Sequence, residues 1–238
     1  GSQRFQGNPL YLQFSEGISN YFQNADNWNV ANFYRLSYVK DHRRGAQFWP
    51  DSGYSYNFTL LQALPVLDST VSFVNLFLET QAYANFDFLN HLVWANRLVG
   101  ISSQGLNPQT FFLGDDVPFQ SYFTTIRGFG GTTFYGSNLA LWNTELRYPI
   151  ATDLNFVLPP LSFLLVKDIE LAGFMDTGVV SDKLGELGES KVLNSVGAGI
   201  RFYSFLFQQS LVELRFDVAW RTDEAAPPEF IFNLAPIF

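Results

Sequence analysis

Apolar and polar residues alternate with period two along most of this chain. In the segment 212–220 every second residue is apolar, and the residues between them include Glu213, Arg215 and Asp217. Strict alternation is typical of a β-strand with one apolar face and one polar face. Charges on the second face indicate that this face is wet. The same alternation recurs at 54–60, 142–148 and 196–202.

The alternation predicts about ten strands. They are expected at residues 8–18, 28–40, 53–63, 70–84, 88–101, 138–149, 163–178, 191–206, 210–221 and 229–238. Short and long connections between them tend to alternate, and the longest is the segment 102–137. Transmembrane up-and-down β-barrels have short periplasmic turns and longer outside loops. Two of the expected turns, 41–52 and 150–162, are longer than this pattern favours.

Composition strengthens the membrane interpretation. Charged residues make up 15% of the chain and aromatic residues 18%, yet the mean hydropathy is only +0.03, because apolar and polar residues are interleaved. No segment has the roughly 20 apolar residues of a transmembrane helix. A spanning protein without such helices has to be a closed barrel, since unpaired backbone groups cannot face lipid. A soluble all-β protein with an unusually aromatic surface is the alternative.

Charge and residue types exclude several kinds of ligand. The net charge of −8 argues against nucleic acid as a partner. The absence of cysteine excludes disulfides and thiolate metal sites, and His42 and His91 are too few for a His-rich site. We therefore expect neither a metal nor a cofactor. Gly1-Ser2 is interpreted as a remnant of cloning, and residues 1–238 as a single barrel domain.

A loop arginine and two downstream carboxylates form the candidate functional site. Arg127 lies in Thr125-Ile126-Arg127-Gly128-Phe129, within the long connection 102–137. Strand parity places Glu145 and Asp176 on the wet face, which in a barrel is the lumen. A guanidinium can bind a carboxylate through two parallel hydrogen bonds. We expect the loop to fold inward, with Arg127 held by both carboxylates; the alternative is a solvated loop arginine near two unrelated acids.

The C-terminal stretch has a pattern of its own. Phe230, Phe232 and Leu234 alternate with other residues, and the chain ends on Phe238. This resembles the C-terminal signal by which bacterial outer-membrane barrels are recognised for insertion. Pro236 departs from the usual pattern, because it removes one donor from the strand ladder. An ordinary hydrophobic edge strand is the alternative interpretation.

The arginine loop resembles the Val-Arg-Gly-Phe/Tyr loop of the BamA-type superfamily of outer-membrane insertases and transporters. Similar family context surrounds it: Glu-Leu-Arg-Tyr-Pro at 145–149, Phe-Met-Asp-Thr-Gly at 174–178, and an Asp-x-Arg turn at 41–43. The resemblance runs from about residue 41 to the end. It implies that Arg127, with Gly128 and Phe129, is a conformational anchor whose lumenal partners are Glu145 and Asp176.

The resemblance also implies a function. Members insert proteins into the bacterial outer membrane or move them across it, in contact with lipid and client outer-membrane proteins and without covalent chemistry. Family barrels have about sixteen strands, whereas about ten are expected here. A barrel or anchor domain of a larger protein, for example a patatin-like one, and a passive plugged pore are the alternatives. If ten strands do not close, the edges at 8–18 and 229–238 could pair with a second copy.

Enzymatic motifs are weak. Asp176-Thr177-Gly178 resembles the Asp-Thr-Gly of aspartic proteases, in which two such carboxylates share a proton. The chain carries one copy, so a homodimer would have to supply the second. No Gly-x-Ser-x-Gly elbow of a hydrolase is present. We therefore expect a protein that is not an enzyme.

Overall fold

The computed structural model describes residues 2–5, 29–46, 49–64, 71–89, 91–114, 124–157, 163–207, 210–223 and 226–236. Long strands account for most of them. These are β2 (Asn29–Asp41), β4 (Trp49–Leu64), β5 (Phe73–Phe86), β6 (Leu92–Gly105), β9 (Asn138–Ala151), β11 (Leu164–Ser181), β12 (Leu193–Leu206), β13 (Ser210–Arg221) and β14 (Glu229–Pro236).

Short elements complete the described structure. The short strands are β1 (Ser2–Phe5), β3 (Arg44–Ala46), β7 (Phe111–Gly114), β8 (Thr133–Gly136) and β10 (Phe156–Val157). Two 3₁₀ turns lie at η2 (Asp87–Leu89) and η4 (Leu184–Glu186). Among the described residues, no helix is long and apolar enough to span a membrane.

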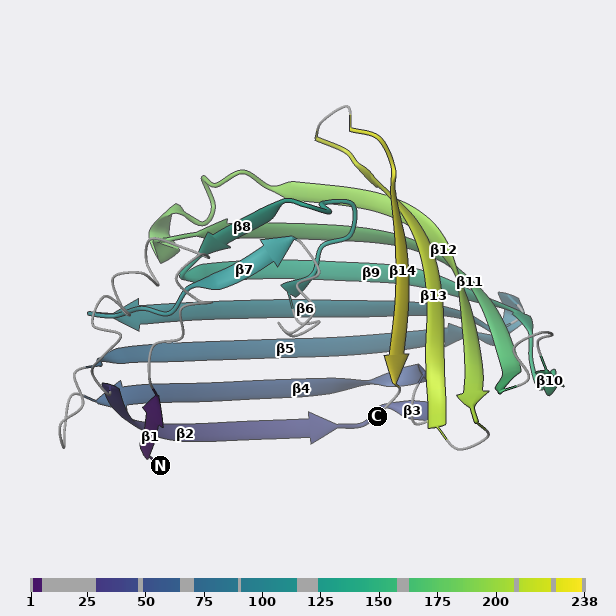
Figure 1. Ribbon diagram of the computed structural model, residues 1–238, viewed down its shortest axis with the longest axis horizontal. Helices are drawn as coiled ribbons and strands as arrows, with labels where there is room; N and C mark the ends of the chain where they lie inside the picture. The colour runs from purple at the N-terminus through teal and green to yellow at the C-terminus, as the bar shows by residue number, and fades with distance from the viewer. Residues whose placement is uncertain are drawn as a thin grey trace.

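One antiparallel sheet runs through the described residues in the order β1-β2-β4-β5-β6-β9-β11-β12-β13-β14. Each long strand pairs with its neighbours along the chain, so the topology is up-and-down. Figure 1 shows that the sheet curls, with the β7–β8 hairpin on its concave side. The predicted all-β, antiparallel up-and-down fold is confirmed.

The expected strands agree with the observed ones except at the chain's start. Every expected strand from 28–40 onward corresponds to a long strand. The expected strand at 8–18 lies outside the described residues. The expected loop 102–137 begins later, because β6 continues to Gly105, and it contains the β7–β8 hairpin. Extra pairing by β3 and β10 explains why the turns 41–52 and 150–162 exceed a minimal length.

The two faces of the sheet differ as the alternation predicts. Large apolar side chains are exposed on the convex face of the long strands, including Leu98, Trp142, Leu146 and Phe216. Residues of opposite parity face the concave side, which is the lumen, and many of them are buried charges or amides. An apolar convex face and a polar concave face are what a sheet between lipid and water requires.

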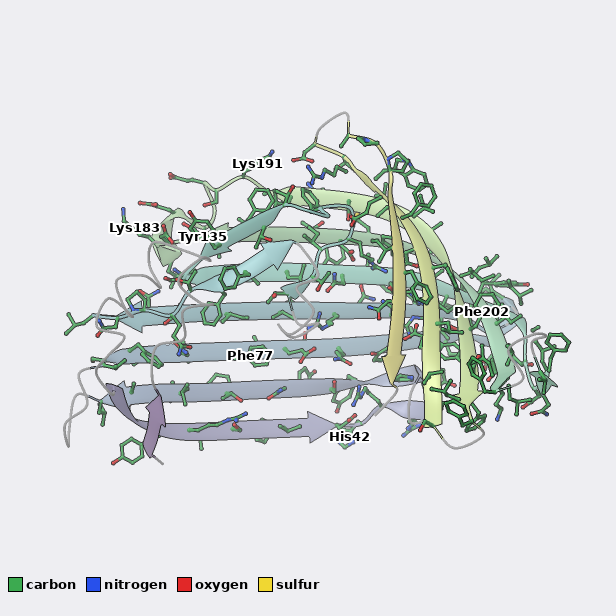
Figure 2. The ribbon with its side chains drawn as sticks, in the orientation of Figure 1. His42, Phe77, Tyr135, Lys183, Lys191 and Phe202 are labelled. Atoms are coloured by element: carbon green, nitrogen blue, oxygen red, sulfur yellow. The ribbon has the colours of Figure 1, made fainter. Side chains whose placement is uncertain are left out.

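The lumenal face is itself divided along the barrel axis. Connections from β4 to β5, β6 to β9, β11 to β12 and β13 to β14 lie at one end, here called the loop rim; the other end is the turn rim. Figure 2 shows Lys183 and His42 at these opposite ends of the sheet.

Toward the loop rim several lumenal side chains are apolar and pack into one core cluster with residues of the 106–137 segment. Its buried members are Val99, Leu113, Ile126, Phe129, Leu139, Leu141 and Leu193. Farther toward the turn rim the lumenal residues are charged, among them Glu79, Arg97, Glu145 and Arg201. The inward-folded segment therefore packs on an apolar part of the lumenal wall, here called the apolar shelf. The charged part of the lumen, here called the charged half-lumen, lies between this shelf and the turn rim.

The orientation of the sheet can be tested on β6. Leu98 lies near the middle of this strand and is 48% exposed on the convex face, so Leu98→Arg would place a charge in the membrane's centre. We expect a loss of about 2–4 kcal/mol of folding free energy, measured by urea titration in lipid vesicles. Leu106→Arg is the matched control, because Leu106 is 85% exposed just beyond the strand. Equal stability of the two variants would contradict a lipid-facing convex surface.

Candidate functional site

Apolar packing holds the arginine loop in the lumen. β7 and β8 pair with each other, and Thr125 forms a parallel bridge to Gly114 at the end of β7. Ile126 and Phe129, on either side of the Arg-Gly pair, are both buried in the core cluster. Burial of two such side chains stabilises the docked loop by about 1.5–3 kcal/mol each. The direction in which Arg127 points is therefore set by its apolar neighbours.

Arg127 is bound on two sides by the predicted carboxylates. Its Nε donates to Asp176 Oδ2 (2.7 Å) and its Nη2 to Asp176 Oδ1 (2.8 Å), which is a bidentate pair. The backbone N–H of Arg127 also donates to Asp176 Oδ2 (3.2 Å). Its Nη1 donates to Glu145 Oε1 (2.8 Å). The structure thus brings together Arg127 from the loop, Glu145 from β9 and Asp176 from β11.

Two further side chains contact the Arg127 guanidinium. Arg127 Nη1 also reaches Asp217 Oδ2 of β13 (3.2 Å), and the guanidinium lies over the ring of Phe174, 3.5 Å from its centroid. A cation over an aromatic ring is attracted to its negative face. Strand parity had already placed Asp217 on the wet face, but no sequence signal paired it with Arg127. Its contribution depends on how far β13 curls toward β11.

The charges of this cluster balance. Glu145 also accepts from Arg147 Nε through Oε2 (3.0 Å) and from Arg201 Nη2 through Oε1 (2.7 Å). Arg201 also pairs with Glu213, which pairs with Arg215. Four carboxylates (Glu145, Asp176, Glu213, Asp217) therefore meet four guanidinium groups (Arg127, Arg147, Arg201, Arg215). Buried charges are tolerated when paired and hydrogen-bonded, and removal of one partner leaves the others uncompensated.

Two glycines of β12 leave room for this cluster. Asp176 and Asp217 lie on the strands either side of β12 and must reach across it to share one guanidinium. A Cβ on Gly199 would collide with the Asp217 carboxylate, and one on Gly197 with the ring of Phe174. Glycine at both positions therefore forms a trough in the lumenal wall. The sequence shows these glycines on the wet face, but only the structure shows what passes over them.

Gly128 has a conformational reason to be glycine. Its φ is +87°, in the left-handed region that side chains disfavour. A Cβ there would also lie 3.3 Å from the Cβ atoms of both Ser195 and Ala219. The chain therefore turns sharply after Arg127 at a point where it touches the lumenal wall. This turn separates Arg127, whose side chain binds the lumenal carboxylates, from Phe129, which packs in the core cluster.

A cavity of about 420 Å³ lies beneath the loop. Charged residues of both signs line it, including Glu79, Arg97, Arg127, Arg147, Glu213 and Arg215. Two ion pairs cross this region: Arg97 Nε with Glu79 Oε1 (2.7 Å) and Arg215 Nη2 with Glu213 Oε1 (3.1 Å). The lumen below Arg127 is therefore polar but without a dominant sign of charge.

The structure describes only some of the residues predicted for the C-terminal signal. Phe230 and Phe232 are exposed on the convex face of β14, by 79% and 61%. The side chain of Leu234 and residue Phe238 lie outside the described part of the chain. Asp176 is fully engaged by Arg127 and Asn143, which leaves the Asp-Thr-Gly motif without an available carboxylate. No group of three or more metal-ligating side chains occurs among the described residues.

Replacement of Arg127 tests the anchor. Arg127→Ala leaves buried carboxylates unpaired, which costs about 3–5 kcal/mol, and Arg127→Lys keeps the charge but cannot make the bidentate pair. We expect faster protease cleavage within 106–137 in both variants, with the larger effect in Arg127→Ala. Arg44→Ala, at an exposed arginine of the turn rim, is the control. Unchanged protection in Arg127→Ala would show that the loop is held without this cluster.

Replacement of Gly199 tests the trough. A Cβ at Gly199 would meet both the Asp217 carboxylate and the backbone oxygen of Phe216, so Gly199→Ala would displace the carboxylate from Arg127 and strain the pairing of β12 with β13 without removing any charge. We expect faster cleavage of the 106–137 segment and a loss of about 1–3 kcal/mol of stability, because a buried carboxylate loses its partner. In β11, Gly173→Ala is the control, since a Cβ there meets nothing within 4 Å. If both variants resist protease like the unchanged protein, Asp217 is not part of the anchor.

Comparison with known proteins agrees with this geometry. Residues 4–235 match the Omp85 superfamily domain. Among solved structures, the chain is similar to BamA from Haemophilus ducreyi lacking POTRA domains 1–3, with a TM-score of 0.55 and 14% sequence identity. The similarity covers 87% of this chain and 42% of that chain, so the chain spans less than half of that protein's length. No curated protein matches the sequence. The lumenal arginine loop, the up-and-down sheet and the domain match lead to one conclusion: this chain belongs to the Omp85 superfamily and resides in the bacterial outer membrane.

Proposed function

We propose that this protein inserts proteins into the outer membrane or moves them across it, by exchange of β-strands at the edge formed by β14. One observation carries the proposal. The arginine loop is docked by paired charges in the lumen, beside a terminal strand that is paired on one side only within the described residues. Outer-membrane lipid and client outer-membrane proteins are the proposed partners.

The edge of β14 supplies the chemistry of recognition. β14 pairs with β13 from Glu229 to Pro236, and the described pairings leave its other side open. An open edge presents N–H and C=O groups that a further strand can pair with, a process called β-augmentation. The proposed activity therefore consists of backbone hydrogen-bond exchange and involves no covalent step.

The described strand order leaves one side of β14 without a described partner. The path from β1 to β14 contains ten strands, and β1 pairs antiparallel with β2 from Asn29 to Asn32. Among the described residues, β14 pairs with β13 and with no strand at the start of the sheet. We propose that a client strand can pair with this side of β14.

Three competing roles give different experimental results. A second copy of the chain could occupy the same edge, in which case the detergent-solubilised protein would be dimeric. A passive pore would give steady conductance in planar bilayers, whereas the docked loop above the charged cavity should keep conductance low until it is displaced. As the membrane anchor of a larger protein, the chain would show neither conductance nor insertion activity.

Reconstitution tests the proposal directly. We expect liposomes that contain this protein to accelerate folding of a client β-barrel by about tenfold or more, followed by the gel shift between folded and boiled client. Liposomes with the same mass of an unrelated small barrel are the control for membrane defects. An equal folding rate in both preparations would refute the insertase proposal and leave the anchor or pore.

A further inference from the structure

A second set of contacts joins the arginine loop to the edge strand. The backbone N–H of Gly130 donates to Glu229 Oε2 (2.9 Å). Glu229 is the first residue of β14, where it pairs with Ala219 of β13. A hydrogen bond to a carboxylate is stronger than one between neutral groups. The loop is therefore tied at one point to the strand proposed to receive clients.

The identity of residue 130 fits this contact. A Cβ on Gly130 would collide with the Glu229 carboxylate, so the approach requires a residue without a side chain. At Gly131 a Cβ would meet nothing within 4 Å. Gly130 has no positive φ to explain its identity, in contrast to Gly128 and Gly131. Close approach to Glu229 is the steric reason that the structure offers for glycine at this position.

Arg221 extends the contact to the end of β13. Its Nε donates to the carbonyl oxygen of Gly128 (2.8 Å) and its Nη2 to Thr132 Oγ1 (3.0 Å). The Arg221 guanidinium also lies over the ring of Phe129, 4.4 Å from its centroid. The loop is thus held from two sides: by β9 and β11 through Arg127, and by the loop-rim ends of β13 and β14.

Little else holds β14 in place. Among its described side chains, Phe230 and Phe232 face lipid, while Ile231 and Asn233 line the cavity. Glu229 makes the side-chain hydrogen bond that links the described part of this strand to another element. The other described attachments of β14 are its backbone bonds to β13 and the packing of Phe232 against Phe216, whose ring centroids lie 4.9 Å apart. Phe232 lies farther along the strand than Glu229, so the tethered end of β14 can separate when the tether is released.

We infer that Glu229 and Gly130 form a latch through which docking of the arginine loop controls the loop-rim end of β14. When Arg127 is bound by Glu145 and Asp176, the latch is closed and β14 is held against β13. When the loop leaves the lumen, Glu229 loses its partner and the end of β14 is free to fray. Its relevance to client entry rests on the proposed function; the coupling of loop and strand does not.

Hydrogen–deuterium exchange of the folded, reconstituted protein tests the latch. We expect Glu229→Ala and Gly130→Ala to raise amide exchange in a peptide covering 226–236 about five- to tenfold, as loss of one hydrogen bond allows. Glu229→Gln keeps an acceptor and should stay close to the unchanged protein. Arg127→Ala should raise exchange in the same peptide, although Arg127 makes no described contact with β14.

Glu186→Ala is the matched control, because Glu186 is an exposed loop-rim carboxylate bonded to Lys183. Peptides from β5 and β6 report on global unfolding and should not change. Exchange in 226–236 that is unaltered by Glu229→Ala, or by Arg127→Ala in a folded protein, would overturn the latch. Raised exchange without any change in client folding would support the latch and refute strand exchange as its purpose.

Discussion

The structure depends on a buried charge cluster in which one loop arginine is shared by carboxylates of three strands. Arg127 binds Asp176 of β11 through two parallel hydrogen bonds and reaches Glu145 of β9 and Asp217 of β13. In a partly dry lumen such pairs are screened less than at a surface, and any unpaired member is costly. The cluster is therefore stable when all its members are paired, which favours the docked position of the loop.

The apolar shelf and the charged half-lumen make different contributions to holding the loop. Ile126 and Phe129 are buried in the core cluster and supply most of the non-directional stabilisation. The charges supply direction, because bidentate pairing is satisfied in one orientation of the guanidinium. Glycines at 128, 197 and 199 contribute by absence of a side chain, since a Cβ on them would meet the lumenal wall, Phe174 and Asp217, respectively.

The same loop lies between the wall of the lumen and its terminal strands. Contacts from Arg221 and Glu229 join it to β13 and β14, while Arg127 joins it to β9 and β11. Among the described residues β14 is paired with β13 alone, so it is a weakly supported edge of the sheet. The position of the loop and the state of the edge are for this reason physically linked, whichever partner the edge receives.

The sequence by itself determined the strands, their two faces and the arginine loop with Glu145 and Asp176, because period-two alternation and a local motif can be recognised without tertiary contacts. Tertiary structure alone decided the rest. Asp217 and Arg221 contact the loop, and Arg201 contacts Glu145, only because the sheet curls, and no local pattern specifies how far it curls. Leu139 and Leu141 have the same parity as Glu145, yet they form the apolar shelf because the β7–β8 hairpin covers them. The bond from Gly130 to Glu229 spans residues far apart in the chain, so it could be found only once β14 had been placed beside the loop.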